Sequence, residues 1–477
     1  MSEYNQVTSE IVKELRGLLG NRNVIYEDKA KLETYSHDEV DDEEYAHMPE
    51  VVTKPANAKE ISKIMKLANR ENIAVTPRGA GSGLSGGAVP ITGGIVLSLE
   101  RMDKILEIDE DNLVAVVEPG VITNNINELL AEKDLFYAGY PMSVESCFIG
   151  GNVAENAGGG RAVKYGVTGR YILGLEMVTP EGDIIQLGGK RVKDVVGYDF
   201  VKLMVGSEGT LGIFTKIIIK LLPLPRHTVN LLILYKDIET AINMVPRILT
   251  KSDKTPTAIE FMDKESVLLV YKYLNEHLPL KGAEALLLIE LDGNDEELME
   301  KAYQSIGDVC LNSGAIEVYV ADSATTRERV WKMRRNIPEA IQTYSEIKSS
   351  EDIVVPIANI PDLLVKIRKI AAQNNVDIFC FGHAGDGNIH SSIVKKPGTE
   401  QANWEENLEK TRREIFQETA KMGGTISGEH GIGHKRKKYM KDIMDSATIE
   451  LMRRVKLAFD PNNILNPGKI FDIEEAK

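Results

Sequence analysis

Three glycine-rich stretches constrain this chain more than any other feature. They read RGAGSGLSGGA at 78–88, IGGNVAENAGGG at 149–160 and GSEGTLGI at 206–213. The surrounding sequence alternates short apolar runs with amphipathic stretches such as AKEISKIMKLANREN, which predicts an α/β pattern interrupted by glycine loops. Glycine is needed where a side chain would block a ligand or where φ is positive. Two such loops in one domain indicate a long ligand held along its length.

The first stretch contains the spacing G-x-G-x-x-G, at Gly81, Gly83 and Gly86. In a dinucleotide site of the Rossmann type, a loop with this spacing opens a long helix. Here Gly87, Pro90, Gly93 and Gly94 follow, so no helix of useful length can start. The sequence therefore favours a loop whose backbone amides wrap a pyrophosphate. A flexible loop without a ligand is the alternative.

The composition excludes several classes of function. The 477 residues leave room for two or three domains. A formal net charge of −15 argues against a nucleic-acid surface, which needs clustered Lys and Arg. The longest apolar runs fall short of the roughly 20 residues that span a bilayer, and MSEYNQVTSE does not read as a secretory signal. We therefore expect a cytoplasmic protein with no transmembrane segment.

The three cysteines, Cys147, Cys310 and Cys380, are widely separated and form no CxxC pair. They cannot supply the four thiolates of an iron–sulfur cluster or a structural zinc site. If the chain moves electrons, another prosthetic group must carry them.

The chain also shows where its parts meet. VTSEIVKELRGLLG predicts an N-terminal helix capped by Thr8 or Ser9. LLPLPRH at 221–227 reads as a domain boundary, because its prolines end a strand. Beyond it, LLILYKD and ALLLIELDG read as strands that alternate with helices, which predicts a second, α+β domain. We expect three parts: 1–225, 226–425, and a C-terminal segment, 426–477, that returns to the first domain.

The stretch FGHAGDGNIH places two histidines symmetrically about Asp386-Gly387. If that pair is the two-residue loop of a hairpin, His383 stands directly opposite His390. Opposed Cβ atoms on one face are about 5 Å apart, close enough for both rings to bind one metal ion. A polar hairpin with two surface histidines is the alternative.

A second histidine-rich stretch, GGTISGEHGIGHKR, brings Glu429 next to His430 in a glycine-rich turn. His383, His390 and Glu429 would make a two-histidine, one-carboxylate set with open coordination positions. A hydrogen-bonded polar cluster without metal is the alternative. His434 has no assigned role, and we expect it at the surface.

Five motifs now carry a specific resemblance. In chain order they are PRGAGSGLSGGA, IGGNVAENAGGG, KYGVTGRYILGLEMVTPEGDI, VGYDFVKLMVGSEGTLGIFTK and FDPNNILNPGKIF. The series resembles the FAD-binding fold of the vanillyl-alcohol oxidase and p-cresol methylhydroxylase type, over almost the entire chain. Within that fold it is most similar to the FAD-dependent D-2-hydroxy acid dehydrogenases, among them D-lactate dehydrogenases, the catalytic subunit of glycolate oxidase and D-2-hydroxyglutarate dehydrogenase. The resemblance implies an α+β architecture: a two-part FAD-binding domain and an α+β substrate (cap) domain built on an antiparallel sheet.

The resemblance implies which residues hold FAD. They lie in the three glycine stretches, the segment between the first two, and the C-terminal motif: Arg78, Gly79, Ala80, Gly81, Ser82, Gly86, Pro141, Gly150, Gly151, Asn152, Ala157, Gly158, Gly159, Gly206, Glu208, Gly209, Ile213 and Asn466. Several relatives attach FAD through a histidine in or near the first loop. This chain has Ser82 there and no histidine between His47 and His227, so we expect FAD to be bound without a covalent link.

The resemblance also implies the catalytic set. It gives His383, His390 and Glu429 as ligands of one divalent ion, which we expect to be zinc, iron or manganese. It assigns the general base to His430, which would take the proton of a substrate hydroxyl while a hydride leaves to the flavin. A substrate carboxylate needs a guanidinium, for which Arg334 in VWKMRRNIPEAI is the match and Arg335 the rival. A solvated helix face is the alternative for both arginines.

The chain departs from D-2-hydroxyglutarate dehydrogenases at two positions that hold a second carboxylate. Pro338 replaces a threonine, and Ser350 aligns with a lysine, with Lys348 two residues away. These departures favour a small monocarboxylate such as lactate or glycolate. We expect FAD-dependent oxidation of a D-2-hydroxy acid, with electrons passed to a partner such as an electron-transfer flavoprotein. Quinone or oxygen as acceptor, a metal-dependent hydrolase, and a non-redox flavoenzyme are the alternatives.

Overall fold

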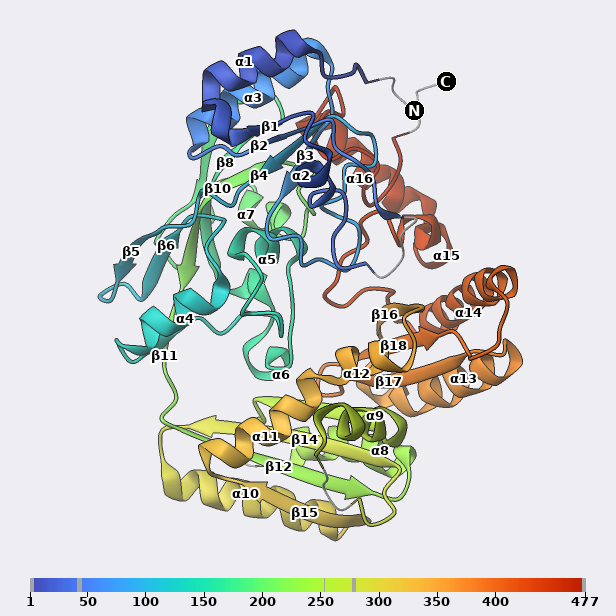
Figure 1. Ribbon diagram of the computed structural model, residues 1–477. Coiled ribbons are helices and arrows are strands. Elements are labelled where there is room, and N and C mark those ends of the chain that lie inside the picture. The colour runs from blue at the N-terminus through green and yellow to red at the C-terminus, as the bar shows by residue number, and fades with distance from the viewer. Residues whose placement is uncertain (1–3, 41–44, 253, 277–279, 474–477) are drawn as a thin grey trace. The chain divides into compact units, whose positions relative to one another are not determined.

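The computed structural model describes residues 4–40, 45–252, 254–276 and 280–473. The chain forms two compact units, whose elements are labelled in Figure 1. Unit 1 is drawn from Met1–Ala157, Val167–Leu224 and Glu429–Lys477, and unit 2 from Gly158–Gly166 and Pro225–Gly428. The chain therefore passes between the units four times. Over the described residues, no helix is both long enough and apolar enough to cross a membrane.

Unit 1 carries the first and third glycine stretches, and the second as far as Ala157. Its elements are α1 (Ser9–Leu19), β1 (Val24–Ile25), α2 (Lys29–Glu33), β2 (Val51–Thr53), α3 (Ala58–Glu71), β3 (Val75–Arg78), β4 (Ile95–Ser98), β5 (Ile105–Asp109), β6 (Val114–Val117), α4 (Thr123–Ala131), β7 (Leu135–Phe136), α5 (Ile149–Glu155), β8 (Ile172–Val178), β9 (Ile184–Gly188), α7 (Phe200–Met204), β10 (Ile213–Lys220), β11 (Leu222–Pro223), α15 (Met440–Ile443) and α16 (Ser446–Phe459).

Two sheets organise unit 1. The first has the strand order β1-β2-β4-β3, in which β2, β4 and β3 run parallel; the second, β5-β6-β10-β8-β9, is antiparallel. Thr8 caps α1 by accepting a hydrogen bond from the Ile11 N–H, as predicted. Helices α1 and α3 bury their apolar residues against the first sheet in one core that also includes Ile464 and Leu465. The end of the chain is thus part of the core of unit 1.

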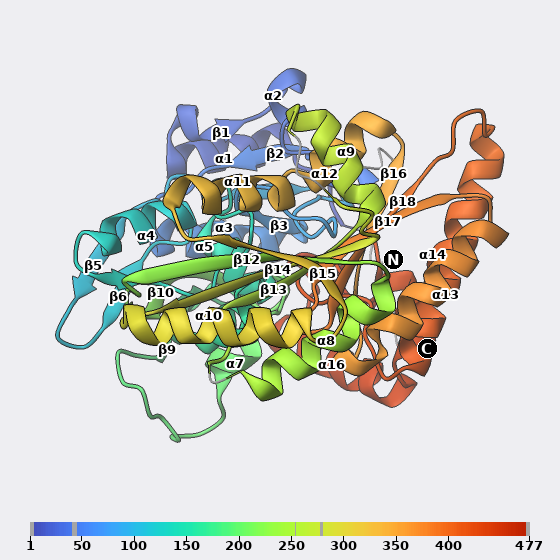
Figure 2. The same cartoon turned by 90° about the horizontal axis from the view of Figure 1, so that it is seen from below.

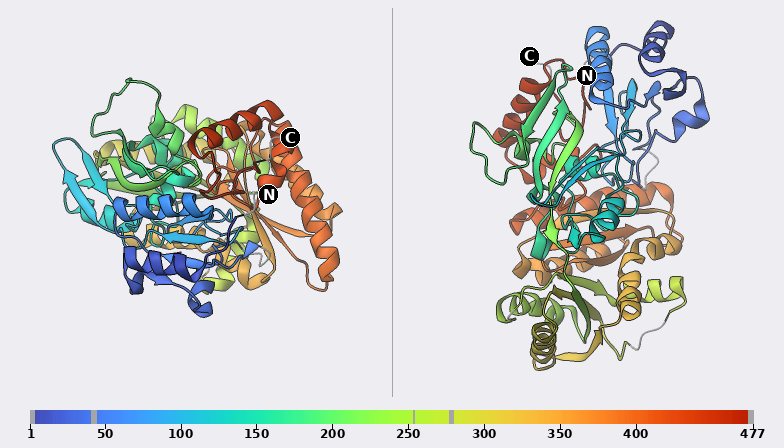
Figure 3. Two further views of the ribbon diagram at one scale, coloured as in Figure 1. Left: turned by 90° about the horizontal axis from the view of Figure 1, so that it is seen from above. Right: turned by 90° about the vertical axis from the view of Figure 1, so that its left-hand side faces the viewer.

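A long loop joins β9 to α7 and extends from unit 1 (Figure 3). Its apolar side chains Val195, Val196 and Tyr198 are 95%, 90% and 87% exposed. Because these side chains bury almost no surface, they contribute little to the stability of unit 1.

Unit 2 is built on one seven-stranded sheet. Its elements are α6 (Ala162–Tyr165), β12 (His227–Tyr235), α8 (Ile238–Lys251), β13 (Ala258–Asp263), α9 (Lys264–Leu274), β14 (Ala285–Gly293), α10 (Glu296–Leu311), β15 (Ala315–Ala321), α11 (Ala324–Arg335), α12 (Ile337–Tyr344), β16 (Lys348–Val354), α13 (Ile360–Gln373), β17 (Asp377–His383), β18 (Asn388–Val394) and α14 (Gln401–Lys421).

The strand order in unit 2 is β15-β12-β14-β13-β17-β18-β16, and every neighbouring pair is antiparallel. Figure 2 shows β12, β14 and β13 side by side. The predicted antiparallel α+β domain is therefore confirmed. Because side chains alternate between the two faces of a strand, this register decides which polar residues meet.

Candidate active site

The first glycine stretch is a loop, as predicted. It leaves β3 at Arg78 and enters β4 at Ile95, and no helix forms between these strands. Gly81 and Gly86 have φ values of +78° and +73°, a conformation that L side chains rarely adopt. The spacing G-x-G-x-x-G therefore serves the loop itself and not the start of a Rossmann-type helix.

Two groups of this loop already have partners within unit 1. The Arg78 guanidinium donates to the His37 carbonyl at 2.7 Å, and burial lowers its pKa. The Gly86 N–H donates to Asp38 Oδ2 at 2.8 Å. Burial raises the pKa of Asp38. Arg78 therefore links the start of the loop to the segment around His37.

The second glycine stretch differs from the prediction, because Gly150, Gly151 and Asn152 lie in a helix, α5, and not in a loop. A Cβ on Gly150 would lie 2.6 Å from Pro119 Cβ, so close packing explains that glycine. A Cβ on Gly151 would meet no atom within 4 Å. Gly151 thus faces open space beside the first loop, where a Cβ on Gly79 would lie 3.8 Å from the Gly151 nitrogen.

The third stretch is tied to the first by the C-terminal motif. Gly206, Glu208 and Gly209 have φ values of +79°, +51° and +65°. The side-chain amide of Asn466 donates to the Gly87 carbonyl at 3.0 Å and to the Glu208 carbonyl at 2.9 Å. One buried amide therefore holds two glycine stretches together.

All three stretches, and the motif that joins them, contain buried polar atoms without a hydrogen-bond partner. These atoms are Ser85 Oγ, Glu155 Oε2, Ser207 Oγ and Asn466 Oδ1. Burial, and then the charge of Glu208, raises the pKa of Glu155 well above its ordinary value. Buried polar groups in proteins are nearly always satisfied by protein, water or ligand. Together with the open space at Gly151, these atoms fit a long polar cofactor such as FAD.

The remaining predicted cofactor residues fall in several settings. Ala80, Ser82 and Pro141 are partly buried in loops of unit 1, and Ala157 is buried there. Ile213 begins β10 with its side chain in the hydrophobic core. Gly158 and Gly159 belong to unit 2.

One face of the unit 2 sheet carries a row of buried polar residues. From β14 across to β16 the row is Asp292 and Glu290, then Glu260, His383, His390 and Asp352. The sequence reasoning missed the acids of this row. Their signal is a carboxylate inside an otherwise apolar strand, as in AIEFMD and ALLLIELDG. Such burial is costly unless each acid has partners.

The histidine hairpin has a different register from the one predicted. His383 pairs with Asn388 and Phe381 with His390, so the turn has four residues and not two. The prediction of directly opposed histidines is therefore wrong. Because the slip is two residues and side chains alternate with a period of two, both rings still project from one face. Their centroids are 5.2 Å apart, and both residues are buried, which excludes two surface histidines.

Glu260 connects the histidine pair to Arg334. Its Oε1 lies 2.7 Å from His383 Nδ1, and its Oε2 accepts from Arg334 Nε at 2.7 Å. Burial alone would raise the pKa of Glu260, but the charges of His383 and Arg334 outweigh it and hold the pKa below its ordinary value. This carboxylate is therefore an acceptor for both groups.

Arg334, and not its rival, belongs to this buried site. Arg334 is 3% exposed, and its guanidinium lies over the Phe381 ring at 5.0 Å. Its Nη2 is buried without a hydrogen-bond partner. Arg335 points to the exposed face of α11 and pairs with Glu328. A solvated helix face thus describes Arg335 and not Arg334.

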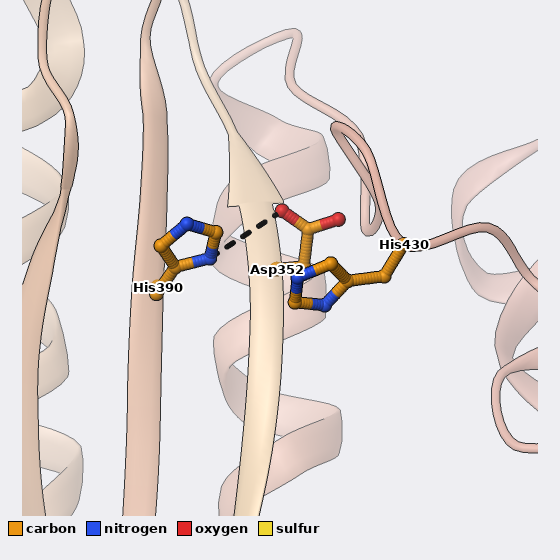
Figure 4. Close-up of side chains that lie close together, drawn as sticks. All are labelled: Asp352, His390 and His430. Carbon is orange, nitrogen blue, oxygen red and sulfur yellow. Dashed lines mark ion pairs between the residues drawn. The ribbon is translucent and has the colours of Figure 1, made fainter. Parts of the chain in front are cut away.

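His390 lies beside a buried aspartate. Figure 4 shows the ion pair between His390 Nδ1 and Asp352 Oδ1, which are 3.8 Å apart. Asp352 also accepts from the Asn388 amide at 2.7 Å and from the Gly428 N–H at 2.9 Å. It therefore ties β16 and β18 to the turn that precedes Glu429.

Glu429 and His430 follow that turn directly. Glu429 begins the last segment of unit 1, and a peptide bond joins it to Gly428. Since consecutive Cα atoms are about 3.8 Å apart, the Glu429 backbone starts next to the turn that Asp352 binds. Glu429 Oε1 and His430 Nε2 are 3.9 Å apart.

His434 is not the surface residue that the sequence suggested. It is partly buried, and its ring meets those of Tyr45 and His47 at 5.8 and 6.1 Å. Burial, and then the charges of Lys437 and Lys469, lower the pKa of His434 to about 4. Its backbone N–H donates to the Ser85 carbonyl, so the C-terminal stretch also contacts the first loop.

Known proteins match both parts of the chain, as two protein families and as full-length relatives. Residues 49–188 match the FAD binding domain family, and residues 224–470 match the C-terminal domain family of FAD linked oxidases. The chain is 40% identical over 473 residues to the glycolate oxidase subunit GlcD of Bacillus subtilis, covering 99% of this chain and 98% of that one. It is 37% identical to a D-lactate dehydrogenase of Anaerostipes hadrus, covering 98% of each chain.

The fold also matches solved structures. p-Cresol methylhydroxylase with bound substrate superposes with a TM-score of 0.81 at 18% identity, covering 99% of both chains. At that identity the likeness establishes the fold alone, which is the one implied by the sequence motifs. On the two family matches and the full-length relatives, the chain belongs to the FAD-linked oxidoreductases that include D-lactate dehydrogenases and glycolate oxidase subunits.

Proposed function

We propose that this FAD-dependent enzyme oxidises a small D-2-hydroxy monocarboxylate, lactate first, to the 2-oxo acid. The names of its relatives, a D-lactate dehydrogenase and a glycolate oxidase subunit, support this substrate class. The observation that carries the proposal is the polar row of unit 2. There two imidazoles with centroids 5.2 Å apart project from one sheet face, and the buried Arg334 of α11, which has an unpartnered nitrogen, bonds to Glu260 on that face.

Each of these groups has a part in the reaction. Arg334 would bind the substrate carboxylate through its unpartnered Nη2. His383, His390 and Glu429 would hold one divalent ion, either zinc, iron or manganese, which supplies a Lewis acid beside the substrate hydroxyl. His430 would take the hydroxyl proton as general base. FAD, when bound, supplies the acceptor for the hydride.

The surroundings of Lys348 support a monocarboxylate. Its ammonium donates to the Pro338 carbonyl at 3.4 Å. This lysine, near the position that would hold a distal carboxylate, is therefore engaged with the protein itself. Glycolate, which lacks the methyl group of lactate, is the second candidate, because a 40% identical relative is named for it.

We further propose that FAD is bound without a covalent link and that its electrons leave to a separate protein, such as an electron-transfer flavoprotein. The three cysteines are far apart and unpaired, so the chain has no thiolate cluster to serve as a second redox centre. Acid precipitation tests the first part. We expect all of the flavin in the supernatant, and flavin that stays with the precipitate would contradict it.

Anaerobic titration tests the substrate and the acceptor. We expect D-lactate to bleach the visible flavin absorbance, L-lactate to leave it unchanged, and glycolate to act more weakly. Reoxidation should be fast with an electron-transfer flavoprotein and slow with oxygen or NAD. A yellow protein that no 2-hydroxy acid bleaches would overturn the redox proposal and favour a non-redox flavoenzyme. A colourless protein would favour a metal-dependent hydrolase, and rapid turnover with oxygen alone would make the enzyme an oxidase.

A further inference from the structure

Glu260 contacts two of the predicted site residues at once. This residue lies on β13 with 0% exposure, and its two oxygens have different partners. One partner is a predicted metal ligand, His383, and the other is the predicted substrate-binding residue, Arg334. Resting on the function proposed above, we propose that Glu260 is a positioning residue that sets the geometry of the metal site and of the substrate-binding arginine together.

The sheet register explains the contact with His383. Glu260 and His383 are direct partners in the pairing of β13 with β17, so their side chains project from the same face. A hydrogen bond from Nδ1–H to Glu260 fixes the histidine tautomer in which Nε2 carries the lone pair. Metal-binding histidines in proteins almost always donate their second ring N–H in this way, and the carboxylate raises the basicity of the ligand.

The contact with Arg334 has a separate consequence. The Glu260 carboxylate accepts a hydrogen bond from Nε of the guanidinium at 2.7 Å. The guanidinium is also held over the Phe381 ring, and that ring lies 5.5 Å from the ring of His390. The unpartnered Nη2 is therefore held near the histidine pair in one orientation. Fixing a fork donor in advance reduces the entropy lost when a carboxylate binds.

A second buried acid on the same sheet face, Glu290, makes contacts that only hold elements of unit 2 together. Glu290 lies on the adjacent strand, β14, and is 3% exposed. It accepts from Trp331 Nε1 at 2.9 Å and pairs with Arg161 at 3.1 Å, which fastens α11 and the Gly158–Gly166 segment to the sheet. Since Glu290 contacts none of the predicted catalytic residues, Glu290→Gln is the matched control for Glu260→Gln.

The first test is Glu260→Gln in the flavin-loaded full chain. An amide has one oxygen, so its NH₂ group must face the N–H of His383 or that of Arg334, whichever way it turns. We expect Mn²⁺, titrated by electron paramagnetic resonance, to bind about 10- to 100-fold more weakly, or the KM for D-lactate to rise about tenfold, or both. In Glu290→Gln both quantities should stay within about twofold. Equal values for the two variants would overturn the positioning role.

A double-variant cycle separates positioning from general damage. Arg334→Lys alone should raise the KM for D-lactate. If Glu260 acts on KM through Arg334, adding Glu260→Gln to that background changes KM by less than about twofold, yet it still weakens Mn²⁺ binding. Multiplicative effects on KM would mean that Glu260 does not act through Arg334, and the proposal would fail.

A second variant keeps the carboxylate and moves it. A Cβ on Gly160 would lie 2.7 Å from Glu260 Oε1, the oxygen that faces His383, and 3.5 Å from the Trp331 ring. Gly160→Ala should therefore weaken Mn²⁺ binding more than it raises KM, even if Glu260→Gln fails to fold. Flavin content and thermal unfolding check that each variant is folded.

The wild-type chain distinguishes a failure of the proposed function from a failure of the positioning role. If it binds no Mn²⁺ and oxidises no 2-hydroxy acid, the proposed function fails together with this inference. If it does both, and neither Glu260→Gln nor Gly160→Ala changes Mn²⁺ binding or KM, only the positioning role is overturned.

Discussion

The glycine region of unit 1 and the polar row of unit 2 are built by opposite means. In unit 1 the functional surface is backbone: positive φ angles at Gly81, Gly86 and Gly209, and open space at Gly151. In unit 2 it is side chain: buried acids and imidazoles that project from one sheet face, and a buried guanidinium of α11 that bonds to one of those acids. A backbone site tolerates changes in neighbouring side chains but not an added Cβ, whereas a side-chain site depends on each hydrogen bond. The two regions should therefore fail differently when altered.

The largest effect should come from removing an imidazole. We expect His383→Ala to weaken Mn²⁺ binding by more than about 100-fold, because a lost ligand costs more than the 10- to 100-fold of a lost supporting contact. Activity should fall in parallel while one flavin per chain remains, since the glycine region is untouched. Elemental analysis and the flavin-to-protein absorbance ratio measure both. His227→Ala, at the start of β12, is the control. Unchanged metal content in His383→Ala would remove the proposed metal site.

The reverse experiment adds one methyl group to the backbone site. Gly151→Ala meets no protein atom and lies in a helix, so without flavin it should stabilise unit 1 by about 1 kcal/mol. Its flavin content should nevertheless fall, because the methyl group occupies the open space. Gly17→Ala in α1, also without neighbours within 4 Å, should give the same stabilisation and keep the flavin. Full flavin retention in Gly151→Ala would place the cofactor elsewhere.

At Asn466 the glycine region of unit 1 depends on a side chain. Asn466→Gly keeps the left-handed backbone, which has a φ of +45°, and removes both amide hydrogen bonds. We expect a loss of about 1–3 kcal/mol of unfolding free energy, measured by urea denaturation. Asn275→Gly, at a φ of +51° on an exposed helix end, should change stability by less than about 0.5 kcal/mol. Equal losses in both variants would mean that the backbone, not the amide, is responsible.

The smallest effect should be a pH dependence from His434. Its folded pKa, about 4, lies below the ordinary value of 6.5, so between these values the unfolded chain takes a proton that the folded chain refuses. This group therefore lowers stability as the pH falls from 6.5 to 4. His434→Gln should reduce the loss of stability between pH 7 and pH 5 by about 1 kcal/mol, a figure lowered for partial exposure. If stability depended on pH in the same way in both proteins, His434 would not be the cause of this loss.

The two regions also differ in how far they could be predicted from sequence. Glycine spacing, helix breakers and the Thr8 cap are local signals, so the first loop, α1 and the family were identified correctly. The hairpin register was not, because a turn of four residues and one of two are both compatible with FGHAGDGNIH. Glu260 was missed altogether. Its contact with His383 depends on the pairing of β13 with β17, strands separated by more than a hundred residues, which no local pattern encodes.

The segment Gly158–Gly166, which lies between two segments of unit 1 but belongs to unit 2, has a consequence for folding during synthesis. Its Lys164 and Tyr165 bind Asp292, which the ribosome adds about 130 residues later in the chain. Unit 1 in turn needs Ile464 and Leu465 for its core, so it cannot be completed until those residues have been synthesised. Unit 2, whose last residue is Gly428, can therefore finish folding before unit 1. The glycine region of the nascent chain must therefore stay incomplete until Ile464 and Leu465 are available, a period in which chaperone binding would protect exposed strands.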